Sequence, residues 1–326
     1  MSVVYKTSTM KKVNVLFLGG AKRVSLAEHL IDAGKRLGLD ISIFSYELEE
    51  KVPLAAIGTI LKGKKWSDVD LFSDLHNQIS NNNITIVLPF VDPAIEVSEK
   101  LKSGNKNLFI PTCSSDICHI MFDKVLSERW FLEKGLPIPL SYTKDDKLIF
   151  PVIVKPRRGS ASKGILVIDD AEQWNKLRNK DNYVIQQYIE DREEYTVDSY
   201  VTTSGKIISI VPRLRIQTVG GEVINSETRR DKDLISLSER VLKSGDFKGP
   251  VTIQYLRDKK NGASYIMEIN PRLGGGVITS IEAGADITEY ILRDYLGEEL
   301  QPFNDWKDKT LMTRYFKEVI FYADNH

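Results

Sequence analysis

The sequence predicts a protein in two parts, a parallel doubly wound α/β unit followed by an α+β unit. Short apolar strands alternate with amphipathic helices over roughly the first 112 residues. Gly135, Pro137 and Pro139 then interrupt the pattern, which is typical of a helix end followed by an extended linker. From Glu194 to Met267 the alternation is mostly that of β-strands.

The α/β unit is expected over residues 13–112, after a loose tail at residues 1–12. Its predicted strands are 13–18, 41–44, 84–88 and 108–110. Gly19-Gly20 follows the first strand without completing G-x-G-x-x-G, so a dinucleotide at this turn is not expected. Ligands of open α/β sheets lie at the carboxyl ends of strands, which makes Gly20 and Asp92 candidate substrate contacts. A plain turn at Gly20 is an equally good interpretation.

The charge balance gives no reason to expect binding to nucleic acid or to an anionic membrane. Lys plus Arg and Asp plus Glu each number 45, so no net basic field recruits nucleic acid or an anionic membrane. Cys113 and Cys118 lack the C-x-x-C spacing of a redox or zinc site. No apolar run approaches the roughly 18 residues of a membrane span. A polar N-terminus leads us to expect a cytoplasmic protein.

A small-residue loop lies between two predicted strands of the second part. Gly159-Ser160-Ala161-Ser162-Lys163-Gly164 joins 152–155 to 165–167, and Lys155 ends the first of these strands. Such a loop can bring backbone N–H groups onto phosphate oxygens as a flap, with Lys155 adding a positive charge. An ordinary hairpin is the alternative.

The segment Tyr265–Arg272 carries the strongest local signal. Glu268 and Asn270 are two apart on a predicted strand, so both side chains point to one face. If residues 257–263 form a hairpin loop, Gln254 lies roughly opposite Glu268 and offers a third oxygen. Hard oxygen ligands of this kind suit Mg²⁺ bound together with substrate phosphates. The alternative is a solvated polar strand face.

In order and spacing, these residues resemble the ATP-grasp superfamily, most closely the synthetase domains of the carbamoyl phosphate synthase large subunit. The resemblance covers about Cys113 to Leu300. It implies a Rossmann-like preATP-grasp domain at 13–112, a linker helix and lid subdomain at 113–190, and a C-terminal α+β subdomain at 191–326.

The resemblance also implies residue roles. Lys124 and Lys155 match the phosphate-binding basic residues, and the flap residues are Ser160, Ala161 and Ser162. The adenine hinge matches Gln186, Gln187, Tyr188 and Ile189, with Gln187 where glutamate is usual. Glu194 matches the ribose-binding acid, and adjacent Glu193 is the competing register. The metal ligands match Gln254, Glu268 and Asn270, and Arg272 faces the transferred phosphoryl group.

The activity implied is that of an ATP-dependent ligase, which activates a carboxylate as an acyl phosphate for attack by an amine or another nucleophile. Its expected cofactors are ATP and Mg²⁺, with Mn²⁺ as an alternative ion. Its expected partners are small-molecule carboxylates and amines, and a homodimer is left open. Candidate substrate contacts in the second part are Arg213 and Gly275. The alternative function is a regulatory module that binds ATP without turnover.

Overall fold

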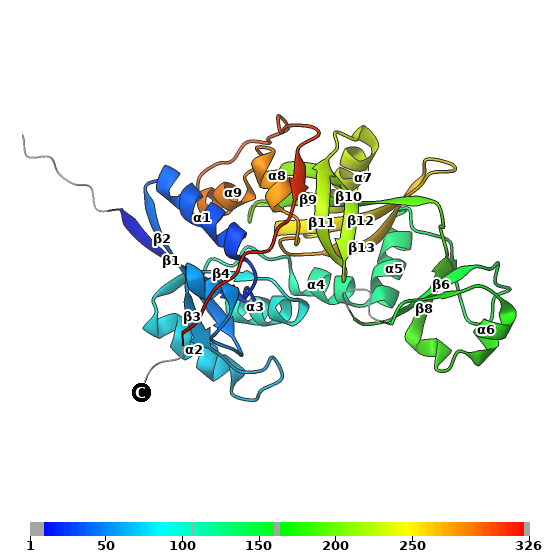
Figure 1. Cartoon of the computed structure of the whole chain (residues 1–326), viewed down its shortest axis with the longest axis horizontal. Coiled ribbons are helices and arrows are strands. Elements are labelled where there is room, and N and C mark those ends of the chain that lie inside the picture. The colour runs from blue at the N-terminus through cyan, green and yellow to red at the C-terminus, as the bar shows by residue number, and fades with distance from the viewer. Residues whose placement is uncertain (1–9, 106, 160–163, 323–326) are drawn as a thin grey trace, which may run out of the picture. The chain divides into compact units, whose positions relative to one another are not determined.

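The computed structural model describes residues 10–105, 107–159 and 164–322, which form two compact units. The first unit consists of the described residues within 1–111, 288–299 and 316–326, and the second of those within 112–287 and 300–315. Figure 1 shows the elements of both.

The first unit contains a four-stranded parallel sheet of order β3-β2-β1-β4. Its strands are β1 (Lys11–Leu18), β2 (Leu39–Glu47), β3 (Thr59–Lys62) and β4 (Ile84–Pro89). Its helices are α1 (Val24–Arg36), the 3₁₀ turn η1 (Pro53–Ala56), α2 (Leu71–Asn81) and α3 (Asp92–Gly104). The strand predicted at 108–110 makes only one parallel bridge, Ile86 with Phe109. Strand β3 is short and was not predicted.

Helices cover both faces of this sheet, as expected for a doubly wound fold. Leu16 and Leu18 of β1 pack in one cluster with Leu75 of α2 and Leu101 of α3. On the other face, Gly34 of α1 lies so close to Ile41 that a Cβ at Gly34 would be 2.1 Å from the Ile41 side chain. Because side chains alternate along a strand, β1 supplies residues to both layers.

Helix α9 (Ile287–Tyr295) was predicted within the C-terminal subdomain 191–326, but residues 288–299 belong to the first unit. Arg36 of α1 forms a 3.1 Å ion pair with Glu289. The rings of Phe109 and Tyr295 lie 5.7 Å apart at an edge-on angle. Contacts between residues that are distant in the sequence decide this assignment, and local sequence patterns do not encode such contacts.

The second unit contains a six-stranded sheet of order β13-β12-β9-β10-β11-β14, with all neighbours antiparallel. Its strands are β9 (Arg192–Val201), β10 (Ile207–Val219), β11 (Glu222–Thr228), β12 (Gly249–Asp258), β13 (Ser264–Asn270) and β14 (Leu311–Thr313). The same unit contains the helices α7 (Lys232–Lys243) and α8 (Ile278–Glu282). The buried side chains Val211, Ala283, Ala285 and Trp306 form one of its core clusters.

A separate four-stranded sheet of order β5-β8-β6-β7 lies in the same unit. Its strands are β5 (Ser141–Tyr142), β6 (Val152–Pro156), β7 (Leu166–Ile168) and β8 (Tyr183–Gln187), with α6 (Ala171–Lys176) and the turn η2 (Lys180–Asn182) between β7 and β8. Trp174 of α6 packs against the buried strand residues of this sheet. Strands β6 and β7 pair antiparallel, which confirms the predicted hairpin type. Residues 160–163 of its loop lie outside the described residues.

The helix predicted from about Ser115 to Lys134 is two helices, α4 (Ser115–Phe122) and α5 (Lys124–Glu133). Asp123 separates them with an extended backbone and accepts hydrogen bonds from the N–H groups of Val125 and Leu126. An aspartate in this conformation is a strong N-cap, so it starts a new helix rather than continuing the first. Lys124 therefore lies in the first turn of α5.

Among the described residues, no helix is long and apolar enough to cross a membrane.

Candidate functional site

One face of the six-stranded sheet gathers the polar residues singled out from the sequence. Gln254 of β12 lies directly opposite Glu268 of β13, and Thr252 lies opposite Asn270. On its other side, Gln254 lies opposite Thr196 of β9. Directly opposed residues of an antiparallel pair project to the same side. The predicted proximity of Gln254 to Glu268 is therefore confirmed.

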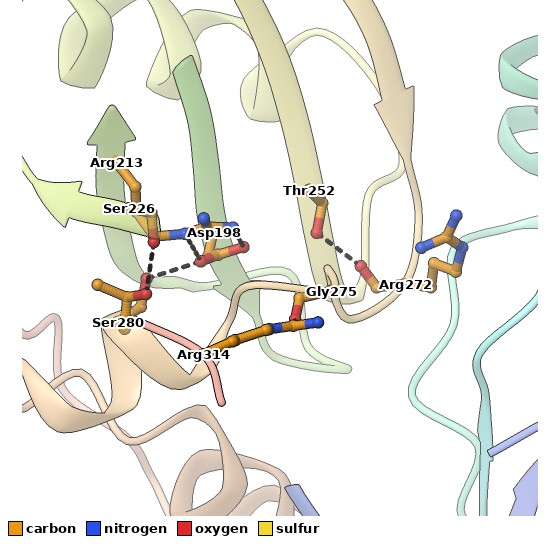
Figure 2. Close-up of polar contacts among 9 residues, drawn as sticks. Asp198, Arg213, Ser226, Thr252, Arg272, Gly275, Ser280 and Arg314 are labelled. Atoms are coloured by element: carbon orange, nitrogen blue, oxygen red, sulfur yellow. Dashed lines mark hydrogen bonds and ion pairs between the residues drawn. The ribbon is translucent and has the colours of Figure 1, made fainter. Parts of the chain in front are cut away.

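Glu268, Asn270 and Arg272 form a contiguous polar group on this face. The Asn270 Nδ2 donates to Glu268 Oε1 at 2.9 Å, and Arg272 Nη2 approaches Asn270 Oδ1 at 3.5 Å. All three side chains are half-buried. The Thr252 hydroxyl donates to the Arg272 carbonyl at 2.9 Å (Figure 2), which fixes the chain where it leaves β13.

The donor chemistry of this group fits a hard divalent cation only in part. Glu268 supplies one carboxylate, and Asn270 and Gln254 supply neutral amide oxygens. Within the described parts of the chain, no group of three or more His, Cys, Asp or Glu side chains is placed to hold a metal ion. A single carboxylate binds Mg²⁺ weakly unless phosphate oxygens complete the coordination. The set therefore fits Mg²⁺ delivered with a nucleotide.

Lys155, the penultimate residue of β6, belongs to a chain of hydrogen bonds. Its Nζ donates to Gln186 Oε1 at 2.9 Å, and the Gln186 Nε2 donates to Glu128 Oε2 at 2.9 Å. The Ser141 hydroxyl donates to the other Glu128 oxygen at 2.5 Å. Burial lowers the pKa of Lys155 to about 8, although the negative charge of Glu268 acts in the opposite direction. Lys155 is thus held in place as a buried cation.

Sequence reasoning missed Glu128, because a glutamate on an amphipathic helix usually faces solvent. Its position four residues after Lys124 on α5 was the available signal, since residues four apart share a helix face. Lys124 Nζ donates to the Gly159 carbonyl at 2.9 Å, beside the flap. The predicted flap contacts Ser160, Ala161 and Ser162 lie outside the described residues.

Asp123 connects α5 to the same hairpin. It pairs with Arg157 at 2.6 Å, and the backbone N–H of Lys124 donates to the Arg157 carbonyl at 3.0 Å. Burial alone would raise the pKa of Asp123, but hydrogen bonds from Arg157 and from the α5 backbone lower it below its ordinary value. The charged carboxylate of Asp123 therefore links the start of α5 to Arg157, the residue after β6.

The predicted hinge 186–189 comprises the last two residues of β8 and the two residues after it, and several of its polar groups already have hydrogen-bond partners. The Gln186 side chain is committed to Lys155 and Glu128. The N–H of Gln187 donates to the Leu140 carbonyl at 2.8 Å, and that of Tyr188 to the Pro151 carbonyl at 3.3 Å. The Ile189 carbonyl accepts from Arg192 at 2.7 Å.

Strand alternation places Glu193 and Glu194, the two candidate ribose-binding acids, on opposite faces of the sheet. Glu193 accepts a hydrogen bond from the Tyr195 hydroxyl at 2.8 Å, and both residues lie on the face away from Gln254. Glu194 lies on the same side as Thr196. It forms a 3.7 Å ion pair with Arg215, whose guanidinium also contacts Gln254. Of these two glutamates, Glu194 is the one that lies on the same face as Gln254 and Glu268.

Arg213, a predicted substrate contact, is part of a buried ion pair. Its Nε donates to Asp198 Oδ2 at 2.6 Å and its Nη2 to Asp198 Oδ1 at 3.2 Å. The Ser280 hydroxyl donates to the same carboxylate at 2.7 Å, as Figure 2 shows. The Arg213 side chain is only 1% exposed. Its guanidinium secures the sheet to α8, which corrects its interpretation as an open substrate contact.

The loop Gly274-Gly275-Gly276 passes tightly over this ion pair. A Cβ at Gly276 would lie 2.5 Å from Arg213 Nη1, and one at Gly274 would lie 3.1 Å from Asp198 Oδ1. The Gly275 carbonyl accepts a hydrogen bond from Arg314 (Figure 2). Glycines are required here because the backbone approaches the two charged side chains closely.

Gly20 and Asp92, the other predicted substrate contacts, lie in the first unit. The Gly20 and Ala21 N–H groups donate to the carboxylate of Glu47, which ends β2. The Ser45 hydroxyl donates to the same carboxylate at 2.6 Å. Burial raises the pKa of Glu47, and these hydrogen bonds act against that rise. Asp92 is the first residue of α3.

Comparison with family models finds two matches. Residues 179–317 match a family described as ATP-grasp in the biosynthetic pathway with Ter operon, and residues 95–191 match the tubulin-tyrosine ligase family. Each match covers less than half of the chain. Together they span most of the second unit.

Among curated proteins, the chain is similar to D-alanine–D-alanine ligases. It is 26% identical to that of Rickettsia canadensis over 184 residues, which are 48% of this chain and 50% of the relative. It is 21% identical to that of Rickettsia typhi over 300 residues, 83% of this chain and 89% of the relative. The chain thus spans about half of the first relative and most of the second.

Solved structures share the fold at low sequence identity. The biotin carboxylase domain dimer of the Hydrogenobacter thermophilus 2-oxoglutarate carboxylase has a TM-score of 0.74 at 17% identity, covering 91% of this chain and 73% of that one. N5-carboxyaminoimidazole synthetase of Staphylococcus aureus, complexed with ADP, has a TM-score of 0.70 at 16% identity, covering 90% and 80%. The predicted fold class is thereby confirmed.

Proposed function

We propose that this chain, a member of the ATP-grasp superfamily, is an ATP-dependent ligase that activates a carboxylate as an acyl phosphate for attack by an amine. The observation that carries the proposal is the grouping of Glu268, Asn270 and Arg272 on one sheet face, within electrostatic reach of the buried cation Lys155. A regulatory module without turnover has no observation in its favour.

The chemical groups of ATP indicate which residues would contact each part of the nucleotide. Phosphate oxygens would contact Lys155 and Lys124, because Lys155 lies in β6 and Lys124 contacts the Gly159 carbonyl three residues after that strand. The adenine edge would meet the remaining backbone groups of 187–189, and the ribose hydroxyls would donate to Glu194. Glu268 and Asn270 would hold Mg²⁺, and Mn²⁺ could replace it because it accepts the same oxygen ligands. The bound ion neutralises phosphate charge.

The chemical steps need positioning and charge neutralisation more than covalent help from the protein. A substrate carboxylate oxygen attacks the γ-phosphorus, and the bond to the ADP oxygen breaks. Lys155 and Arg272 offset the negative charge on the transferred group. The amine then attacks the acyl carbon and phosphate leaves. The predicted flap at 159–164 would exclude water from the acyl phosphate, as closing loops do in other enzymes.

The substrate class rests on the relatives. Two are named as D-alanine–D-alanine ligases, and the biotin carboxylase structure holds Mg-ADP and bicarbonate. D-alanine carries a carboxylate, and bicarbonate is a related anion. We therefore propose small-molecule carboxylates and amines as substrates, amino acids among them.

The proposal is tested by ADP formation from Mg-ATP with pooled carboxylates and amines, with and without hydroxylamine. Hydroxylamine traps acyl phosphates, so a matching carboxylate should give ADP and a hydroxamate in equal amounts even without the amine. The Glu268→Gln variant serves as the control for background ATPase activity. Nucleotide binding without ADP release in any pool would favour the regulatory module instead.

A pH-dependent effect is expected at Lys155. Lysine attracts phosphate only when protonated, so the affinity of the wild-type protein for an ATP analogue should fall as the pH rises above about 8. Lys155→Met should bind at least about 30-fold more weakly at pH 7, a loss of about 2 kcal/mol, and should lose this pH dependence. Calorimetric titration between pH 7 and 9.5 measures both effects.

The lowered pKa of Lys155 also has a consequence for stability. Its value in the folded protein lies below the ordinary 10.5, so the charged form opposes folding below about pH 8. That cost disappears as the pH rises toward the unfolded value. Wild-type protein should therefore gain stability relative to Lys155→Met between these pH values. Equal pH profiles for the two proteins would contradict the burial of a charged Lys155.

A further inference from the structure

The guanidinium of Arg215 contacts the side chain of Gln254, one of the three residues that the sequence predicts as metal ligands. Its Nη1 donates to Gln254 Oε1 at 2.9 Å, and its Nη2 donates to the Gly221 carbonyl at 3.2 Å. The Arg215 side chain is 10% exposed. A fixed cation therefore lies at the amide oxygen of Gln254, across the strand pair from Glu268.

The negative charges on this part of the sheet are few. Glu268 is paired with Asn270, and Glu194 lies 3.7 Å from Arg215. The carboxylate of Asp198 already accepts hydrogen bonds from Arg213 and Ser280. Gln254 itself is neutral. Two divalent cations about 4 Å apart repel each other strongly unless carboxylates surround them. Glu268 alone cannot supply that compensation beside a guanidinium.

Arg215 also retains capacity to bind an anion. Its buried Nε has no hydrogen-bond partner among the residues that the structure describes, and its ion pair with Glu194 is longer than a hydrogen bond. An unsatisfied buried N–H carries a free-energy cost that a bound oxygen would remove. A phosphate oxygen meets this need, because it brings both an acceptor and a negative charge.

We propose that the protein binds ATP with a single divalent cation, held by Glu268 and Asn270, and that the Arg215 guanidinium at Gln254 takes the place of a second cation. The proposal rests on the proposed ATP site. Gln254 then acts as a positioning residue that orients Arg215. The glutamine is essential to this arrangement, because a carboxylate at position 254 would attract a second cation as well as the guanidinium.

The test is the number of Mn²⁺ ions bound per protein, measured by electron paramagnetic resonance with a saturating non-hydrolysable ATP analogue. Wild-type protein should bind one Mn²⁺ per bound nucleotide. The double variant Arg215→Ala/Gln254→Glu should bind two, because it removes the fixed cation and adds a carboxylate. Arg215→Lys should keep one ion, since it retains the charge.

Nucleotide affinity provides the second readout. Arg215→Ala alone should weaken binding of the analogue about tenfold or more. Arg178→Ala, which removes an exposed arginine of the same unit, should leave it unchanged. Two Mn²⁺ ions in the wild-type complex would overturn the proposal while leaving the ATP site intact. Failure of the wild-type protein to bind the analogue at all would overturn the proposed function as well.

Discussion

Replacing Glu268 with Gln is expected to remove Mg²⁺-dependent nucleotide binding and turnover while leaving the fold intact. Gln keeps the size of the side chain and an oxygen that accepts from Asn270 Nδ2. It removes the only carboxylate of the proposed metal group, and a hard cation depends on that charge. We expect turnover to fall about 100-fold or more, because the ion offsets charge in the transition state.

A thermal-shift experiment with an ATP analogue, with and without Mg²⁺, isolates this effect. Wild-type protein should gain additional stability when both are present, and Glu268→Gln should not. Glu193→Gln is the matched control, because Glu193 lies on the opposite face of the sheet and contacts Tyr195. The metal assignment is wrong if Glu268→Gln shows the same Mg²⁺-dependent stabilisation as the wild-type protein.

Replacing Asp198 with Ala is expected to destabilise the second unit severely. The substitution leaves Arg213 charged and buried, and it removes the acceptor of Ser280. Breaking a buried ion pair at one partner costs about 3–5 kcal/mol, mostly because the remaining charge is left without compensation. The loop above the pair should also loosen, since Gly274 and Gly276 pack against these two side chains.

Urea denaturation measures the loss of stability. Glu239→Ala provides the comparison, because it removes one partner of the exposed pair with Lys243 and should cost less than about 1 kcal/mol. The double variant Asp198→Leu/Arg213→Met should be more stable than Asp198→Ala, since no buried charge is left unpaired. A cost for Asp198→Ala as small as that for Glu239→Ala would contradict a structural role for the pair.

The sequence predicted correctly that Gln254, Glu268 and Asn270 lie together on one sheet face, because the information for this placement is local. Strand alternation placed Glu268 and Asn270 on one face, and a short hairpin loop set Gln254 opposite Glu268. The fold class followed from the change of periodicity between the two parts. Neither inference needed contacts between residues distant in the chain.

The different contacts of Arg213 and Arg215 could not be predicted from the sequence. Both lie on the same face of β10, two residues apart. Only the register of β10 with β9 reveals that Asp198 neutralises Arg213, whereas Arg215 reaches Gln254. The membership of residues 288–299 in the first unit depends in the same way on contacts made across the chain.

The formation of an acyl phosphate is the central claim, and transfer of an oxygen isotope tests it most directly. A carboxylate substrate labelled with ¹⁸O should pass one labelled oxygen to inorganic phosphate in each turnover, because its oxygen attacks the γ-phosphorus. Product phosphate without the label, formed at the same rate as the ligated product, would contradict the account. Label in AMP instead would identify activation at the α-phosphorus.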